Sequence, residues 1–314
     1  MNSYSIAIHG GAGTILKSLM SAEKEQEYRL ALDSALHAGE RVLAADGSAV
    51  DAVETAIMEL EDCIIFNAGR GAVFTHGGKN EMDASIMDGS NLMAGAVTCI
   101  SNIKNPIALA KKIMTDSEHV FMSGTGAQDF ARQMKVDFMP DAYFFSQERY
   151  DQLLRAREVN QILLDHNLTN EKKFGTVGAV ALDRNGNLAA GTSTGGMTNK
   201  RFGRIGDSPV IGAGNYANNR TCAISCTGHG EYFLRHVVAY DISCLIEYKN
   251  YSLTRACELV VMDKLKKAGG EGGLIAIDRN GHVEMPFNTE GMYRAKKHEE
   301  DESPLIAIYK DETD

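Results

Sequence analysis

Thr176 combines a nucleophilic hydroxyl with a backbone position that could itself react. Gly175 precedes it, and an apolar stretch typical of a buried strand follows from Val177 to Leu182. Because glycine tolerates strained torsions, the Thr176 hydroxyl could attack the Gly175 carbonyl and form an ester that water hydrolyses. Thr176 would then hold a free α-amine beside its own hydroxyl, so one residue would supply both nucleophile and general base. A plain strand-opening threonine after a loop glycine is the alternative.

The residues around Thr176 predict a loop followed by a hairpin. A polar run from Thr169 to Lys173 is typical of a flexible loop. The turn Asp183-Arg-Asn-Gly contains the Asn-Gly pair of tight hairpins, and Leu188 to Thr194 forms the predicted partner strand. The candidate nucleophile therefore lies where an exposed loop enters a buried sheet.

Four motifs follow one another in a fixed order along the chain. They are Phe174-Gly-Thr-Val-Gly-Ala-Val-Ala-Leu-Asp, Thr192-Ser-Thr-Gly-Gly-Met-Thr-Asn-Lys, Gly203-Arg-Ile-Gly-Asp-Ser-Pro and Cys226-Thr-Gly-His-Gly-Glu. Together they closely resemble the plant-type L-asparaginases, also called isoaspartyl peptidases, of the N-terminal-nucleophile (Ntn) hydrolases. The resemblance continues at His9-Gly-Gly-Ala-Gly, Phe66-Asn-Ala-Gly and Pro286-Phe-Asn-Thr-Glu-Gly-Met-Tyr. It covers nearly the whole chain and weakens only between about 135 and 173 and after 295.

The resemblance assigns catalytic roles to residues that match these motifs. It implies that Thr176 is the nucleophile and that Thr194 hydrogen-bonds it, although a cross-strand threonine without a catalytic role is the alternative for Thr194. It also implies that Thr227 and Gly228 stabilise the oxyanion. Two positioned donors of this kind are worth ~2.7–4 kcal/mol each in acyl transfer.

Arg204 and Asp207 are suited to bind the two charged ends of an amino acid. A guanidinium pairs bidentately with a carboxylate, and an aspartate pairs with an ammonium group. Together they would leave a substrate's β-carbonyl pointing at Thr176, unless they form an ion pair with each other. The resemblance adds further substrate contacts from Thr227, Gly228, Gly230 and Asn67.

Asn67 and His229 can also be interpreted as residues without a catalytic role. Asn67 resembles the family's asparagine near the nucleophile, but a turn-forming asparagine fits the sequence as well. His229 is not assigned to catalysis, because the α-amine of Thr176 already fills the role of general base.

A structural sodium ion is implied by the resemblance alone, and no catalytic cofactor is expected. Backbone carbonyls would hold the ion, as suits a hard cation. The matching residues are Leu60, Glu61, Cys63, Phe66, Ala68 and Arg70. The glycine run from His9 to Gly13 lacks the residues of a P-loop, which argues against nucleotide binding.

The composition of the 314 residues is that of an ordinary soluble globular protein, with 44% hydrophobic and 24% charged residues. A net charge of −10 disfavours nucleic acid or an anionic membrane as the main partner. We find no signal peptide or membrane-spanning stretch, and six cysteines lie in apolar surroundings without zinc-site spacing, so we expect a cytoplasmic location.

The order of elements predicts an α+β fold. Strands, helices and strands follow one another and then repeat, which favours two stacked sheets with helices outside. The resemblance implies a four-layer αββα sandwich of the Ntn-hydrolase type with mainly antiparallel sheets. Helices are predicted over Ser21–Ala45, Ser48–Leu60 and Gly230–Tyr248. We also expect a loop over residues 9–13 and a solvated surface loop from Lys296 to Glu302.

We expect a single domain, 1–314, that cleaves itself between Gly175 and Thr176. The products would be an α-subunit, 1–175, with a flexible tail from about 135 to 175, and a β-subunit, 176–314. The resemblance implies a homodimer of such cleaved heterodimers.

The reaction implied is hydrolysis of a β-amide of aspartate. The substrates would be L-asparagine and β-aspartyl (isoaspartyl) dipeptides, with L-aspartate and ammonia or an amine as products. Two alternatives remain, a glycosylasparaginase-like hydrolase and an uncleaved, non-enzymatic amino-acid binder that keeps Arg204 and Asp207.

Overall fold

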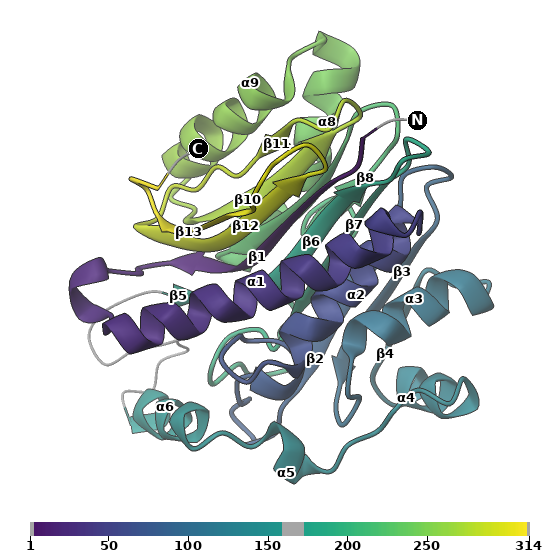
Figure 1. The fold of residues 1–314 in the computed structure, drawn as a ribbon. Coiled ribbons are helices and arrows are strands. Elements are labelled where there is room, and N and C mark those ends of the chain that lie inside the picture. Colours follow the sequence, from purple (N-terminus) through teal and green to yellow (C-terminus); the bar gives the residue numbers. More distant parts are fainter. Residues whose placement is uncertain (1–2, 159–172, 313–314) are drawn as a thin grey trace.

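Two β-sheets form the centre of the molecule in the computed structural model, which describes residues 3–158 and 173–312 (Figure 1). The larger sheet has nine strands, of which eight form one continuous order. These are β13 (Leu305–Tyr309), β12 (Gly291–His298), β1 (Ser5–Gly13), β6 (Val177–Leu182), β7 (Leu188–Thr194), β2 (Met82–Asp88), β3 (Ala94–Ile100) and β4 (Phe121–Ser123). The two-residue β5 (Lys173–Phe174) pairs with the end of β1. In these described parts, all pairs in this sheet are antiparallel except β3–β4.

The smaller sheet has four strands and packs against the larger one. Its order is β11 (Val283–Glu284), β10 (Gly272–Asp278), β9 (Cys222–Gly228) and β8 (Asn215–Ala217). Apolar side chains of both sheets meet in one buried layer, in which Val180 and Ala190 join Ile275. Along β6, Val180 and Leu182 face this layer, whereas Val177, Ala179 and Ala181 pack on the opposite face with the helices.

Helices cover the outer face of each sheet. Outside the large sheet lie α1 (Ala22–Ala44), α2 (Ala49–Asp62) and α3 (Pro106–Asp116), whose buried residues pack with those of β1 and β2. Outside the small sheet lie α7 (Gly230–His236), α8 (Val238–Lys249), α9 (Leu253–Cys257) and a π-helical segment, Glu258–Leu265. The predicted α+β architecture of two stacked sheets between helices is therefore confirmed. Among the described helices, which include α4 (Gly124–Gln133), none has the length and hydrophobicity needed to cross a membrane.

The first two helices begin where the sequence predicts. Ser21 and Ser48 are the N-caps of α1 and α2, and each hydroxyl accepts a backbone N–H three residues later. Such caps satisfy N–H groups that have no partner inside the helix. Figure 1 shows α1 and α2 side by side across the large sheet.

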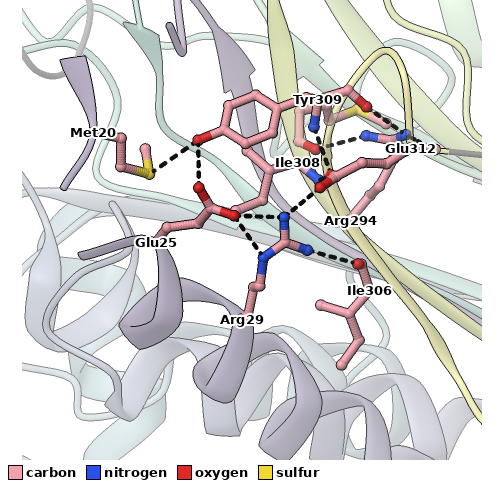
Figure 2. A network of polar contacts seen from close by, with 9 residues as sticks. Met20, Glu25, Arg29, Arg294, Ile306, Ile308, Tyr309 and Glu312 are labelled. Atoms are coloured by element: carbon pink, nitrogen blue, oxygen red, sulfur yellow. Dashed lines mark hydrogen bonds and ion pairs between the residues drawn. The ribbon is translucent and has the colours of Figure 1, made fainter. Parts of the chain in front are cut away.

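Polar contacts fix α1 to the C-terminal end of the chain (Figure 2). Arg29 pairs with Glu25 at 2.8 Å and donates to the carbonyl of Ile306 at 2.9 Å. The Tyr309 hydroxyl donates to Glu25, and Glu312 accepts the backbone N–H of Tyr309 at 2.9 Å. An early helix and the last strand are thus held together by side chains.

Three local predictions are wrong. The run from His9 to Gly13 is the end of β1, with a bulge between His9 and Gly11, and not a loop. Gly10 serves close packing, because a Cβ at this position would lie 2.3 Å from the Phe66 ring. The helix predicted over Gly230–Tyr248 is broken at Val237, whose φ is 49°.

The third prediction, a solvated loop from Lys296 to Glu302, is wrong for its first three residues. Residues 296–298 belong to β12, which pairs with β1 along eight positions and with β13 on its other side. Consecutive charged residues hid the end of this strand, although its buried positions alternate with partly exposed ones there.

Residues 135–158 contain folded elements. The short helix α5 (Asp141–Phe144) and α6 (Gln147–Glu158) bury Phe144 and Arg149. Arg149 donates to the carbonyl of Ile65 at 3.2 Å, which joins α6 to the loop after α2. The first part of the segment expected to be flexible is therefore folded, and residues 159–172 of that prediction lie outside the described residues.

Candidate active site

Thr176 lies at the beginning of β6, beside the end of β7. The two strands pair so that Val177 faces Ser193, which places Thr176 next to Thr194. Thr176 is 7% exposed, and its hydroxyl donates to the Thr194 hydroxyl at 3.2 Å. The predicted hairpin is therefore what brings these two threonines together.

The carbonyl of Gly175 accepts two hydrogen bonds from side chains. Thr194 Oγ1 and Asn67 Nδ2 each donate to it at 2.9 Å. Asn67 is held in turn, because its amide donates to Gly196 O at 2.7 Å and its oxygen accepts the N–H of Val73 at 3.0 Å. This arrangement polarises the peptide bond between Gly175 and Thr176 and is the geometry of an oxyanion hole.

A small pocket opens beside this peptide bond. It is lined by Gly175, Thr176, Thr194, Gly196, Met197, Arg204, Gly206, Asp207, Ser208 and Gly228. Asp207 is buried, and its Oδ2 has no hydrogen-bond partner among residues 3–158 and 173–312. Burial raises the pKa of Asp207 to about 7. A buried carboxylate oxygen without a partner is costly, and a cation bound in the pocket would relieve it.

Thr227 and Gly228 are the last residues of β9, and Gly228 lines this pocket. The Thr227 hydroxyl is fully buried, and within the described parts of the chain it also has no hydrogen-bond partner. Gly228 has a φ of 156°, and a Cβ there would lie 2.5 Å from the Phe233 ring and the Glu271 carbonyl. The glycine is required by this close packing, which in turn fixes the end of the strand.

Arg204 forms its ion pair with Glu231 and not with Asp207. Its Nε and Nη2 donate to the two carboxylate oxygens of Glu231, each at 2.9 Å. The internal Arg204–Asp207 pair, which the sequence leaves open, is therefore not formed. Gly230 packs against both residues, because a Cβ at that position would lie 2.9 Å from Asp207 Oδ1 and 3.0 Å from Arg204 Nη2.

His9 supports the nucleophile from the neighbouring strand. Its Nδ1 lies 3.1 Å from the carbonyl oxygen of Thr176, and its Nε2 lies 3.0 Å from Ser225 Oγ. A carbonyl only accepts, so Nδ1 carries the proton and Nε2 accepts from Ser225. Burial lowers the pKa of His9 to about 3, which keeps the ring neutral. Its position fits a structural role and does not fit that of a base.

The loop after α2 packs its carbonyls tightly around glycines. A Cβ at Gly69 would lie 2.5 Å from Glu61 O, and one at Gly71 would lie 2.0 Å from Phe66 O. Carbonyl oxygens crowded against glycines are compatible with a cage for a hard cation. The carbonyls of Leu60, Cys63, Phe66 and Ala68 also accept backbone N–H groups of this loop.

Comparison with known proteins decides the family. A family model described as asparaginase matches residues 2–307. The chain belongs to the asparaginase family. The isoaspartyl peptidase of Escherichia coli strain K12 is 51% identical over 312 residues, covering 98% of this chain and 97% of that relative. The isoaspartyl peptidase of Salmonella typhimurium strain LT2 is 51% identical over 314 residues, and covers 99% of this chain and 100% of the relative. The human isoaspartyl peptidase/L-asparaginase is 40% identical over 281 residues, with 90% and 88% covered.

Two features of this asparaginase-family site were not recognised in the sequence. Glu231 lies in the quoted motif Cys226-Thr-Gly-His-Gly-Glu, and a carboxylate near a predicted anion-binding arginine was a usable signal. The side chain of Glu61 is fully buried and accepts from Ser193 Oγ at 2.6 Å and Ile107 N at 3.0 Å. Burial raises the pKa of Glu61 to about 8, and no local pattern indicated this.

Proposed function

We propose that the protein is an autoprocessing threonine amidohydrolase that hydrolyses β-aspartyl dipeptides and L-asparagine. The observation that carries the proposal is the Gly175 carbonyl, held by Thr194 and Asn67 next to the Thr176 hydroxyl at one end of a pocket that contains Asp207. The names of the relatives support the substrate class, because they are isoaspartyl peptidases and isoaspartyl peptidase/L-asparaginases.

Self-cleavage uses the chain of hydroxyls around Thr176. Thr176 donates to Thr194, and Thr194 donates to the Gly175 carbonyl. Thr176 Oγ1 bonds to the Gly175 carbonyl carbon as its proton passes to Thr194 Oγ1 and the proton of Thr194 passes to the Gly175 oxygen, which Asn67 also stabilises. The C–N bond then breaks, and the nitrogen takes the proton and becomes the α-amine of Thr176. Water hydrolyses the ester to the Gly175 carboxylate and restores the hydroxyl.

The mature site repeats this chemistry on the substrate. The α-amine of Thr176 accepts the hydroxyl proton, because its reference pKa of about 7.7–8.0 leaves part of it neutral near pH 7. Thr176 Oγ1 attacks the β-carbonyl, and Thr227 and Gly228 stabilise the oxyanion. The leaving amine takes the proton, and water then hydrolyses the acyl-enzyme to L-aspartate.

Substrate binding uses the charged groups of the pocket. The unpartnered oxygen of Asp207 accepts the substrate's ammonium group, which supplies the partner that the buried carboxylate lacks. Arg204 faces the same pocket and binds the α-carboxylate. Gly230 leaves room for both groups, and the β-carbonyl is directed at Thr176.

The two fragments remain associated after cleavage in this proposal. Strand β1 of the first fragment lies between β12 and β6 of the second, and β2 pairs with β7. The contacts of Arg29 with Ile306 and of Glu25 with Tyr309 also cross from one fragment to the other (Figure 2). A homodimer of these heterodimers remains part of the proposal, on resemblance alone.

A sodium ion and a reducing compartment complete the proposal. Carbonyls at the end of α2 and in the following loop, which contains Phe66 and Asn67, would hold the ion and stabilise that loop. All six cysteines are free thiols, which supports a cytoplasmic location.

Ammonia release from L-asparagine and amine release from a β-aspartyl dipeptide test the function. The purified wild type should hydrolyse both and should show two bands on a denaturing gel. Purified Thr176→Ala should show one band and no activity. A wild type that stays uncleaved and inactive but binds L-aspartate would support the amino-acid binder instead.

A further inference from the structure

Glu231 occupies only one edge of the Arg204 guanidinium. Arg204 Nε donates to Glu231 Oε1 and Arg204 Nη2 donates to Glu231 Oε2, both at 2.9 Å. A guanidinium has five N–H groups arranged around a plane. Within residues 3–158 and 173–312, Glu231 therefore fills the Nε edge, while Nη1 and the second proton of Nη2 remain for a ligand.

The remaining edge lies at the pocket because two glycines leave space for it. A Cβ at Gly206 would lie 3.1 Å from Arg204 Nη1, and a Cβ at Gly230 would lie 3.0 Å from Arg204 Nη2. Both Arg204 and Asp207 line the pocket. The open edge of the guanidinium is thus presented beside the carboxylate that would bind the substrate's ammonium group.

Glu231 is itself held in place by its neighbours. His229 Nε2 lies 3.3 Å from Glu231 Oε2, and the His229 ring packs edge-on against Tyr232 at 4.9 Å between centroids. Burial acts to raise the pKa of the Glu231 carboxyl, but hydrogen bonds from His229 and Arg204 outweigh it and lower that pKa. Glu231 therefore stays ionised and keeps accepting both guanidinium hydrogen bonds.

We propose that Glu231 is a positioning residue that fixes Arg204 for bidentate binding of the substrate's α-carboxylate, with His229 orienting Glu231. This inference rests on the proposed function and names a residue that acts through Arg204 without touching the substrate. An arginine side chain loses considerable rotamer freedom when it binds a ligand, and Glu231 removes that freedom before binding. Its negative charge also opposes the substrate carboxylate, so the two effects have opposite signs and can be separated.

The test compares Glu231→Gln and Glu231→Ala with the control Glu299→Gln. Glu299 also pairs with an arginine, Arg184, in the turn at the far end of β6 from Thr176. We expect KM for L-asparagine to rise about tenfold in Glu231→Gln and more in Glu231→Ala, because hydrogen bonds to a charged group are lost. We expect kcat to stay within about twofold, because the same interaction binds ground and transition states. The control should match the wild type.

A substrate without the α-carboxylate separates positioning from a general effect on the fold. L-Aspartic diamide carries an α-carboxamide in place of the carboxylate, so its kcat/KM should be equal in Glu231→Gln and wild type. An equal loss on both substrates would overturn the inference, as would an unchanged or lowered KM for L-asparagine. Glu231→Gln is nearly isosteric and keeps one acceptor, so it tests the inference even if Glu231→Ala does not fold.

The proposed function and the role of Glu231 can be refuted separately. Wild type that neither cleaves itself nor releases ammonia would contradict the function. Active, cleaved wild type with unaltered Glu231→Gln kinetics would overturn only the role of Glu231.

Discussion

Replacing Thr194 with valine removes one hydroxyl from the centre of the Gly175–Thr176 hydrogen bonds and keeps the shape of the side chain. That hydroxyl accepts from Thr176 Oγ1 at 3.2 Å and from Gly196 N at 3.0 Å, and it donates to Gly175 O at 2.9 Å. Valine would leave Asn67 as the remaining side-chain donor to the carbonyl that is attacked. Self-cleavage should therefore slow sharply while the fold persists.

The expected loss of self-cleavage rate follows from the two roles of the Thr194 hydroxyl. One oxyanion donor is worth about 10²–10³ in rate, and a proton acceptor contributes about 10²–10⁴. Because the same group does both, the effects do not multiply, and we expect a loss of about 10³, or ~4 kcal/mol of barrier. Thr194→Ser keeps the hydroxyl and should lose no more than about tenfold.

The assay follows the decay of the uncleaved chain after its synthesis in a cell-free reaction, on a denaturing gel. Thr192→Val is the matched control, because Thr192 lies on the same strand, is equally buried, and bonds Gly214 O at 3.2 Å and Ser225 Oγ at 3.0 Å. Each valine leaves buried polar groups unsatisfied and should cost about 1–3 kcal/mol of stability. The control should cleave at nearly the wild-type rate.

Similar rates in Thr194→Val and Thr192→Val would refute the reasoning. Such a result would mean that lost stability, and not the lost hydroxyl beside the Gly175 carbonyl, limits cleavage.

Further predictions concern Asp207, Glu61 and Asn67. The pKa of Asp207 is about 7, so the inhibition constant of L-aspartate should rise about tenfold per pH unit below 7, whereas that of succinate, which lacks the ammonium group, should not. Burial raises the pKa of Glu61 from 4.5 to about 8, so the folded state binds the extra proton. The contribution of Glu61 to the free energy of unfolding is therefore fully present below pH 4.5. It falls by up to ~1.4 kcal/mol per pH unit as the pH rises to about 8. Urea unfolding of Glu61→Gln, in a Thr176→Ala background that keeps one chain, should lack this slope. Asn67→Asp replaces the donor to Gly175 O with an acceptor and should slow self-cleavage by about 10²–10³, measured on the same gel.

Local sequence signals predicted the elements that carry the nucleophile. The Asn-Gly turn and the continuous apolar stretch before it predicted the β6–β7 hairpin that brings Thr176 and Thr194 together. Ser21 and Ser48 gave the starts of α1 and α2 because caps act within one turn. Packing across the fold could not be read in this way. Gly10 of β1 is explained by the ring of Phe66, which lies far away in the sequence.

Charge pairs were the least predictable part of the site. Arg204 and Asp207 lie three residues apart, and the sequence leaves open whether they pair with each other. The structure pairs Arg204 with Glu231 of α7 and leaves Asp207 Oδ2 without a partner in the parts of the chain it describes. The strand β12 was hidden in the same way, because a run of charged residues in a sequence resembles a solvated loop.

Intact-mass measurement of the purified wild type tests the central claim most directly. If Thr176 attacks the Gly175 carbonyl, active protein must contain two fragments, 1–175 and 176–314, the second beginning with a free threonine amine. A fully active preparation with the mass of one uncut chain would contradict the account.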